Sequence, residues 1–104
     1  YELTVFHTPC TWTDESFCRE AVPYIREIVG EDKVNEIPPM TGTEDFGYVT
    51  EKVPGMFVFI GAGEPGNAPL HSPRMVLDEA VLPIGAAVHA NVAVSWLREH
   101  RREK

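Results

Sequence analysis

Apolar residues recur at helical spacing between Phe17 and Ile28, where each apolar side chain is followed by another three or four positions later. This period is typical of a helix with one buried face. Thr13 is a suitable N-cap, with two acidic residues in the first turn, and Gly30 is a suitable stop. The pattern predicts a helix over 13–29, with a kink or break at Pro23 because proline has no N–H.

A second helical pattern follows Asp78, which is a suitable N-cap, and continues to Arg98. Its apolar positions occupy almost every face, which predicts a helix packed under a sheet along most of its length. The run from Ala80 to Leu97 has no charged residue and is long enough to resemble a membrane span. It also contains proline, glycine, five alanines and three polar residues, one of them His89, so a helix buried in protein is the favoured interpretation.

Three other stretches predict strands. Tyr1 to His7 alternates between two faces, and residues 33–37 are a weaker candidate for an exposed or edge strand. Met56 to Ile60 is apolar at every position, which is typical of a strand covered on both faces. This favours the central strand of an α/β sheet.

A short helix is predicted after Met40, with Thr43 as N-cap and Glu44 and Asp45 in its first turn. Adjacent carboxylates at such a position often serve only to cap the helix. The functional alternative is that they face a site, because a helix N-terminus also offers free backbone N–H groups.

The loop after Ile60 delivers His71, which Pro69 and Pro73 bracket. The loop has a Gly-x-Gly sequence but lacks the Lys-Ser/Thr of a phosphate-binding loop, and prolines stand where a dinucleotide-binding helix would begin. Open α/β sheets place ligands beyond the carboxyl ends of their strands. Spacing alone leaves His71 open to either role, since most loop histidines face solvent or form hydrogen bonds.

Composition narrows the class of protein. The 104 residues include 16 acidic and 9 basic side chains, a formal charge of −7, so nucleic acid and anionic membranes are poor partners. Cys10 and Cys18 stand eight apart, which indicates neither a disulfide framework nor a structural zinc site. With no signal peptide pattern at the start, we expect a cytoplasmic protein.

Four motifs, taken together, resemble one family. They are Met-Thr-Gly-Thr-Glu-Asp-Phe-Gly-Tyr (40–48), Val-Pro-Gly-Met-Phe-Val-Phe-Ile-Gly (53–61), Pro-Leu-His-Ser-Pro (69–73) and Asp-Glu-Ala-Val-Leu-Pro-Ile-Gly-Ala-Ala (78–87). Their order and spacing resemble the C-terminal end of metal-dependent amidohydrolases related to aminoacylase and carboxypeptidase G, in the branch of hippurate hydrolase and the auxin-conjugate hydrolases.

The resemblance implies an α/β fold: a fragment of a three-layer zinc-peptidase-like catalytic domain, with a central strand flanked by helices. Residues 13–104 would be the C-terminal portion of that domain. Residues 1–12 would be the last strand of a lid or dimerisation domain and its connector. By this reading the chain is about the last quarter of a longer enzyme that forms homo-oligomers.

Members of this family hydrolyse the amide bond of N-acyl amino acids with one or two divalent metals, usually zinc or manganese. His71 matches the family's last metal ligand, and Glu44 and Asp45 match a motif that resembles a wall of the cleft. The other ligands and the catalytic Glu belong to a portion upstream of the lid. The resemblance therefore predicts that this chain alone contains no catalytic residue, is inactive and holds metal weakly or not at all.

Two alternatives remain open. One is a small non-catalytic domain that keeps the ancestral core and works by self-association or partner binding, for example through Tyr1 to His7. The other is a self-sufficient hydrolase that uses His71 with Glu44 or Asp45. It has the least support, because no second metal ligand stands at a recognisable spacing and no nucleophile motif is present.

Overall fold

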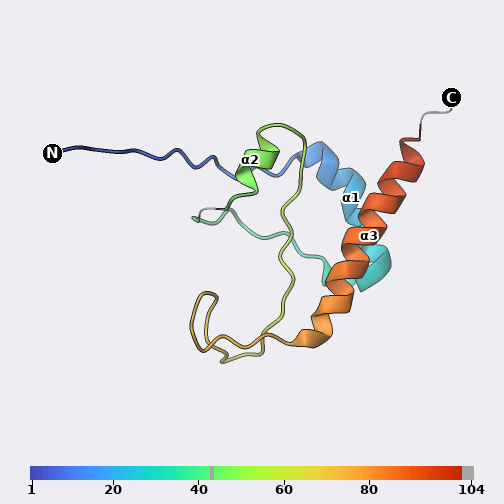
Figure 1. Cartoon of the computed structure of the whole chain (residues 1–104). Helices are drawn as coiled ribbons and strands as arrows, with labels where there is room; N and C mark the ends of the chain where they lie inside the picture. Colours follow the sequence, from blue (N-terminus) through green and yellow to red (C-terminus); the bar gives the residue numbers. More distant parts are fainter. Residues whose placement is uncertain (43, 102–104) are drawn as a thin grey trace.

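The computed structural model describes residues 1–42 and 44–101, and their regular structure is helical (Figure 1). The elements are α1 (Glu15–Val29), η1 (Glu31–Lys33), α2 (Gly47–Thr50), η2 (Glu79–Val81) and α3 (Leu82–Glu99). No strand forms within these residues, so the α/β layering stays a prediction.

Helix α1 begins and ends close to where its sequence predicts. The cap is Asp14, one residue later than the expected Thr13, and its carboxylate accepts a hydrogen bond from the Phe17 N–H at 2.7 Å. Gly30 ends the helix with φ 97°, and its N–H donates to the Arg26 carbonyl at 2.7 Å. Of the kink or break predicted at Pro23, the break is wrong, because the helix continues through the proline. Burial of the two residues that follow the proline offsets the one hydrogen bond it removes.

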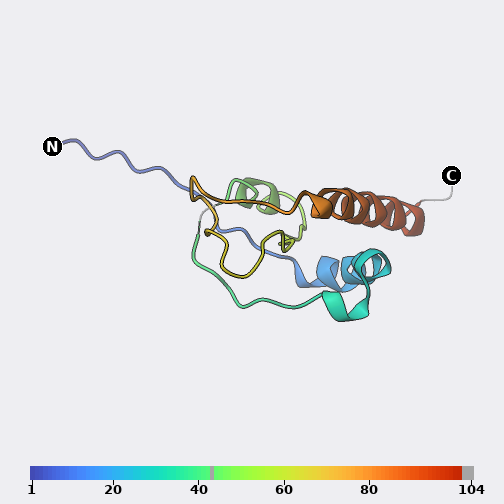
Figure 2. The same cartoon turned by 90° about the horizontal axis from the view of Figure 1, so that it is seen from below.

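The apolar core lies between α1 and α3, which run side by side in both views (Figures 1 and 2). Its buried apolar side chains are Ala21, Tyr24, Ile25 and Val88. Beside them, the Asn91 side-chain amide donates to the Tyr24 carbonyl at 2.8 Å and to the Glu27 carboxylate at 2.9 Å. The hydrogen bonds of Asn91 therefore join the two helices beside their apolar contact.

Helix α3 follows η2, which Asp78 caps by accepting a hydrogen bond from the Ala80 N–H at 2.9 Å. The prediction that α3 is buried along most of its length is wrong for this chain, since Val88 is its one buried residue. His89, which a helix buried in protein would place in or near the core, is exposed. The physical reason is that no sheet lies against α3 to cover its other faces.

One helical stretch of the described chain, Glu79–Glu99, is long and apolar enough to cross a membrane. It has 21 residues, and its most apolar window of 18 residues has a mean hydropathy of 1.5 and is 6% buried. A single helix of this kind is weak evidence, because core helices of soluble proteins meet the same criteria. The absence of a membrane partner accordingly stays a prediction.

The predicted central segment, Met56 to Ile60, runs between α2 and the loop before α3 without forming a strand. Phe57 packs against Phe46 and Phe59, with ring centroids 5.9 and 5.1 Å apart. Val58, Phe59 and Ile60 are exposed. A strand needs a hydrogen-bonded neighbour, and no described segment supplies one. For the same reason residues 1–7 and 33–37, also predicted as strands, form none.

The chain is open compared with a self-contained domain of its size. Its accessible surface is 9224 Å², whereas a folded monomer of 11.6 kDa exposes about 5,800 Å². Its radius of gyration is 16.9 Å, against about 13 Å for a compact chain of this length. Most of the apolar side chains that the pattern assigns to a core are therefore exposed to solvent.

The contact between α1 and α3 predicts a shifted titration of the Tyr24 hydroxyl. A hydrogen bond with the Glu99 carboxylate, together with burial and the neighbouring carboxylates Glu20 and Glu27, raises the pKa of Tyr24 from 10.0 to about 12. Because the pKa is raised in the folded state, the protonated Tyr24 side chain stabilises the fold. This stabilisation is complete below pH 10.0 and is lost as the pH rises toward about 12. We expect Glu99→Gln to lower the pKa of Tyr24, measured by tyrosinate absorbance.

Tyr24→Phe should remove one step from the tyrosinate titration, and the step that disappears is the one that belongs to Tyr24. An unchanged titration in Glu99→Gln would contradict the contact between Tyr24 and Glu99.

Candidate functional site

His71 lies in a loop that is closed at its base. The Asp78 N–H donates to the Ala62 carbonyl at 2.8 Å, which joins the two ends of the loop just before η2. Three hydrogen-bonded turns follow one another within it, over residues 64–67, 69–72 and 72–75. The loop is therefore a folded unit that leads from the segment 56–60 to α3.

His71 is the third residue of the turn from Pro69 to Ser72, in which the Ser72 N–H donates to the Pro69 carbonyl at 3.1 Å. Its φ is 65°, and it is the one described non-glycine residue with a positive φ. The left-handed region costs an L-residue about 1–2 kcal/mol, so glycine usually occupies such a position. The imidazole is exposed. The turn therefore holds His71 in a backbone conformation that most residues avoid, with its side chain exposed to solvent.

Glu44 and Asp45 lie together just before α2, and both are exposed. Their main-chain carbonyls accept hydrogen bonds from the N–H groups of Gly47 and Tyr48, each at 3.1 Å. The helix begins only at Gly47 and has no side-chain cap, so these carboxylates do not cap it. The predicted cap Thr43 lies outside the described residues.

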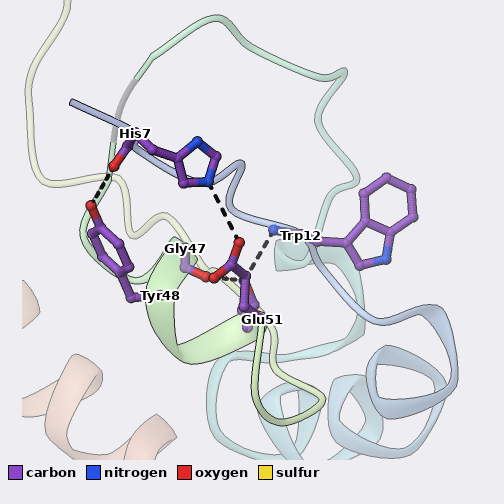
Figure 3. Close-up of polar contacts among 6 residues, drawn as sticks. His7, Trp12, Gly47, Tyr48 and Glu51 are labelled. Atoms are coloured by element: carbon purple, nitrogen blue, oxygen red, sulfur yellow. Dashed lines mark hydrogen bonds and ion pairs between the residues drawn. The ribbon is translucent and has the colours of Figure 1, made fainter. Parts of the chain in front are cut away.

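The segment before α1 contacts α2 closely, which the sequence does not predict (Figure 3). The Tyr48 hydroxyl donates to the His7 carbonyl at 2.7 Å, and the Trp12 N–H donates to the Thr50 hydroxyl at 3.3 Å. The His7 imidazole lies 3.8 Å from the Glu51 carboxylate. A hollow of about 270 Å³ beside these contacts is lined by Trp12, Asp14 and residues 50–55, and by none of the predicted site residues.

The described residues do not compose a metal site. Zinc takes three or four protein ligands, yet residues 1–42 and 44–101 bring no three His, Cys, Asp or Glu side chains together. His71 is thus a candidate ligand without described partners, and a metal held there would need ligands from other residues.

The two cysteines are free, Cys10 exposed and Cys18 half-buried. Burial, followed by the charges of Asp14 and Glu36, raises the pKa of the Cys18 thiol. A raised pKa lowers the fraction of reactive thiolate, so Cys18 is poorly suited to act as a nucleophile.

Comparison with known proteins identifies the family. Residues 1–95 match the family described as peptidase family M20/M25/M40. The chain belongs to this family. Enzymes of the M20 family generally depend on divalent metals and have an α/β zinc-peptidase-like fold. This agrees with the resemblance to metal-dependent amidohydrolases seen in the motifs.

Relatives of the chain share this assignment. It is 37% identical over 93 residues to the IAA-amino acid hydrolase ILR1-like 2 of Arabidopsis thaliana, a match that covers 88% of the chain and 21% of that protein. It is 44% identical over 64 residues to an N-acetyldiaminopimelate deacetylase of Streptococcus suis, covering 62% of the chain and 16% of the deacetylase. The thermostable carboxypeptidase 2 of Saccharolobus solfataricus is 38% identical over 66 residues, covering 61% of the chain and 17% of that enzyme.

The chain therefore spans about a fifth, or less, of the length of these relatives. No solved structure matches it significantly.

The backbone at His71 predicts an unusual order of stability. In the middle of a helix or strand, a protein with glycine is less stable than the same protein with alanine by about 0.5–1 kcal/mol. At φ 65° we expect the reverse: His71→Gly should be more stable than His71→Ala by about 1 kcal/mol, because glycine alone adopts this region without strain. Urea unfolding of the two variants measures the difference. Equal stabilities, or a more stable alanine variant, would contradict the left-handed backbone.

Proposed function

We propose that this chain is the C-terminal part of a metal-dependent amidohydrolase that hydrolyses the amide bond of N-acyl amino acids. The observation that carries the proposal is the match to the M20/M25/M40 peptidase family over residues 1–95, from a chain about a fifth as long as its Arabidopsis relative. The names of two relatives, an IAA-amino acid hydrolase and an N-acetyldiaminopimelate deacetylase, support an N-acylated amino acid as substrate.

In this proposal His71 is a ligand of the metal, zinc or manganese, and Glu44 and Asp45 form a wall of the cleft. The exposed imidazole in a loop closed at its base supports the first role. Two exposed carboxylates on the segment just before α2 support the second. Neither role includes proton transfer or nucleophilic attack, and the proposal assigns no catalytic residue to this chain.

The open surface of the chain also fits a part of a larger domain. The apolar segment Met56 to Ile60 and most of α3 lack a covering layer among the described residues. In a complete enzyme a sheet would cover α3, and neighbouring strands and helices would cover the segment Met56 to Ile60. The competing proposal, a small domain that works by self-association, would cover the same surface with a second copy.

The chain alone should be inactive. We expect no hydrolysis of N-acyl amino acids by the pure 104-residue protein with zinc or manganese added, because one imidazole cannot hold and position a catalytic metal. Release of the free amino acid measures the activity. Turnover that depends on metal and disappears in His71→Ala would overturn the prediction and favour a self-sufficient hydrolase.

The intact mass of the native protein separates the two proposals. A species several times heavier than 11.6 kDa would establish the chain as part of a larger enzyme, in which His71→Ala should then abolish activity. A native mass near 11.6 kDa would contradict the amidohydrolase fragment and favour the small domain.

A further inference from the structure

Helix α2 is too short to be stable by itself. It has four residues, Gly47–Thr50, and no side-chain cap. Isolated helices shorter than about 12–15 residues are marginal in water, because the first turn fixes several dihedral angles for one hydrogen bond. Contacts from outside the helix must therefore hold α2 in place.

Several of those contacts come from residues 7–14, which from here on we name the connector. It forms three hydrogen bonds with α2 and its flanks. The Tyr48 hydroxyl donates to the His7 carbonyl at 2.7 Å, and the Trp12 N–H donates to the Thr50 hydroxyl at 3.3 Å. The Thr11 hydroxyl donates to the Glu44 carbonyl at 3.5 Å. Farther along, the Asp14 N–H donates to the Gly55 carbonyl at 2.8 Å. Figure 3 shows that the segment with His7 and Trp12 passes beside α2, close to Gly47 and Tyr48.

The closest approach is at Gly47, where the connector lies directly on the helix backbone. A Cβ atom added there would lie 2.6 Å from the Pro9 carbonyl oxygen and 3.2 Å from Pro9 Cγ. Pro9 and Gly47 are both buried, although most of their neighbours are exposed. Gly47 does not have a positive φ, so the position requires glycine for this contact and not for its backbone conformation.

We propose that the connector and α2 fold as one cooperative unit, so that Glu44 and Asp45 keep their position only while the connector is docked on Gly47. Glu44 links the two directly, because its carbonyl accepts hydrogen bonds from both Gly47 of α2 and Thr11 of the connector. Displacement of residues 7–14 removes the contacts that hold a helix unable to stand alone. Whether this regulates a cleft rests on the proposed function, but the coupling itself does not.

Gly47→Ala tests the coupling with a result of opposite sign for the two interpretations. If α2 were independent, alanine would strengthen it and slow its amide exchange, because alanine favours helices over glycine. If the connector holds α2, the added methyl group displaces Pro9, and amide hydrogen exchange should become on the order of tenfold faster. The faster exchange should appear both at Tyr48 to Glu51 and at Trp12.

Gly42→Ala is the matched control, since nothing lies within 4 Å of a Cβ at Gly42, and it should leave both sets of amides unchanged. Amides of Tyr24 and Ile25 in α1 report whether the effect is local. Slower exchange in α2 of Gly47→Ala, or faster exchange in α2 or the connector alone, would overturn the proposal.

Tyr48→Phe keeps the ring and removes the hydrogen bond to His7, and so decides the case if Gly47→Ala unfolds the whole chain. We expect about fivefold faster exchange at Trp12 and across α2 together. No change at either place would overturn the coupling. These exchange results do not depend on activity or native mass, so the coupling can fail while the amidohydrolase proposal stands, and the reverse.

Discussion

The packing of α1 on α3 is the contact on which the rest of the structure depends. Ala21, Tyr24 and Ile25 of α1 and Val88 of α3 form the buried hydrophobic core of the described chain there. The remaining segments are joined to this pair by single hydrogen bonds, short turns and the connector contact. Since burial of apolar surface is the main favourable term in folding, the stability of this chain is concentrated in one helix pair.

This concentration explains which parts of the fold the sequence predicts. The ends of α1 and the start of η2 are specified by residues that act on their own neighbours: Asp14, Gly30 and Asp78. Such signals operate within a few residues and need no distant partner. The strand expected at Met56 to Ile60 has a correct apolar pattern, but a strand exists only beside another strand. Its prediction therefore depended on a partner that the described residues do not contain.

The site follows the same division. The sequence predicts that a loop after the apolar segment carries His71, and the structure places it in such a loop. It does not predict the left-handed backbone at His71, because the residue type at this position favours other conformations. Nor does it predict the contact of Pro9 with Gly47, which joins segments far apart in the sequence. The signal that could have pointed to this close approach is the glycine at the start of the short helix, Gly47.

The hydrogen bond between Asp78 and Ala62 affects how tightly His71 can bind a ligand. The tip of an unrestrained loop samples a volume that grows with the length of the loop. A metal-binding side chain at the tip loses this conformational freedom when it binds. A loop tied at its base and folded into three turns has already given up much of that freedom. Beside a metal held by other ligands, the imidazole would act at a high effective concentration, so that one weak donor binds as a member of a chelate.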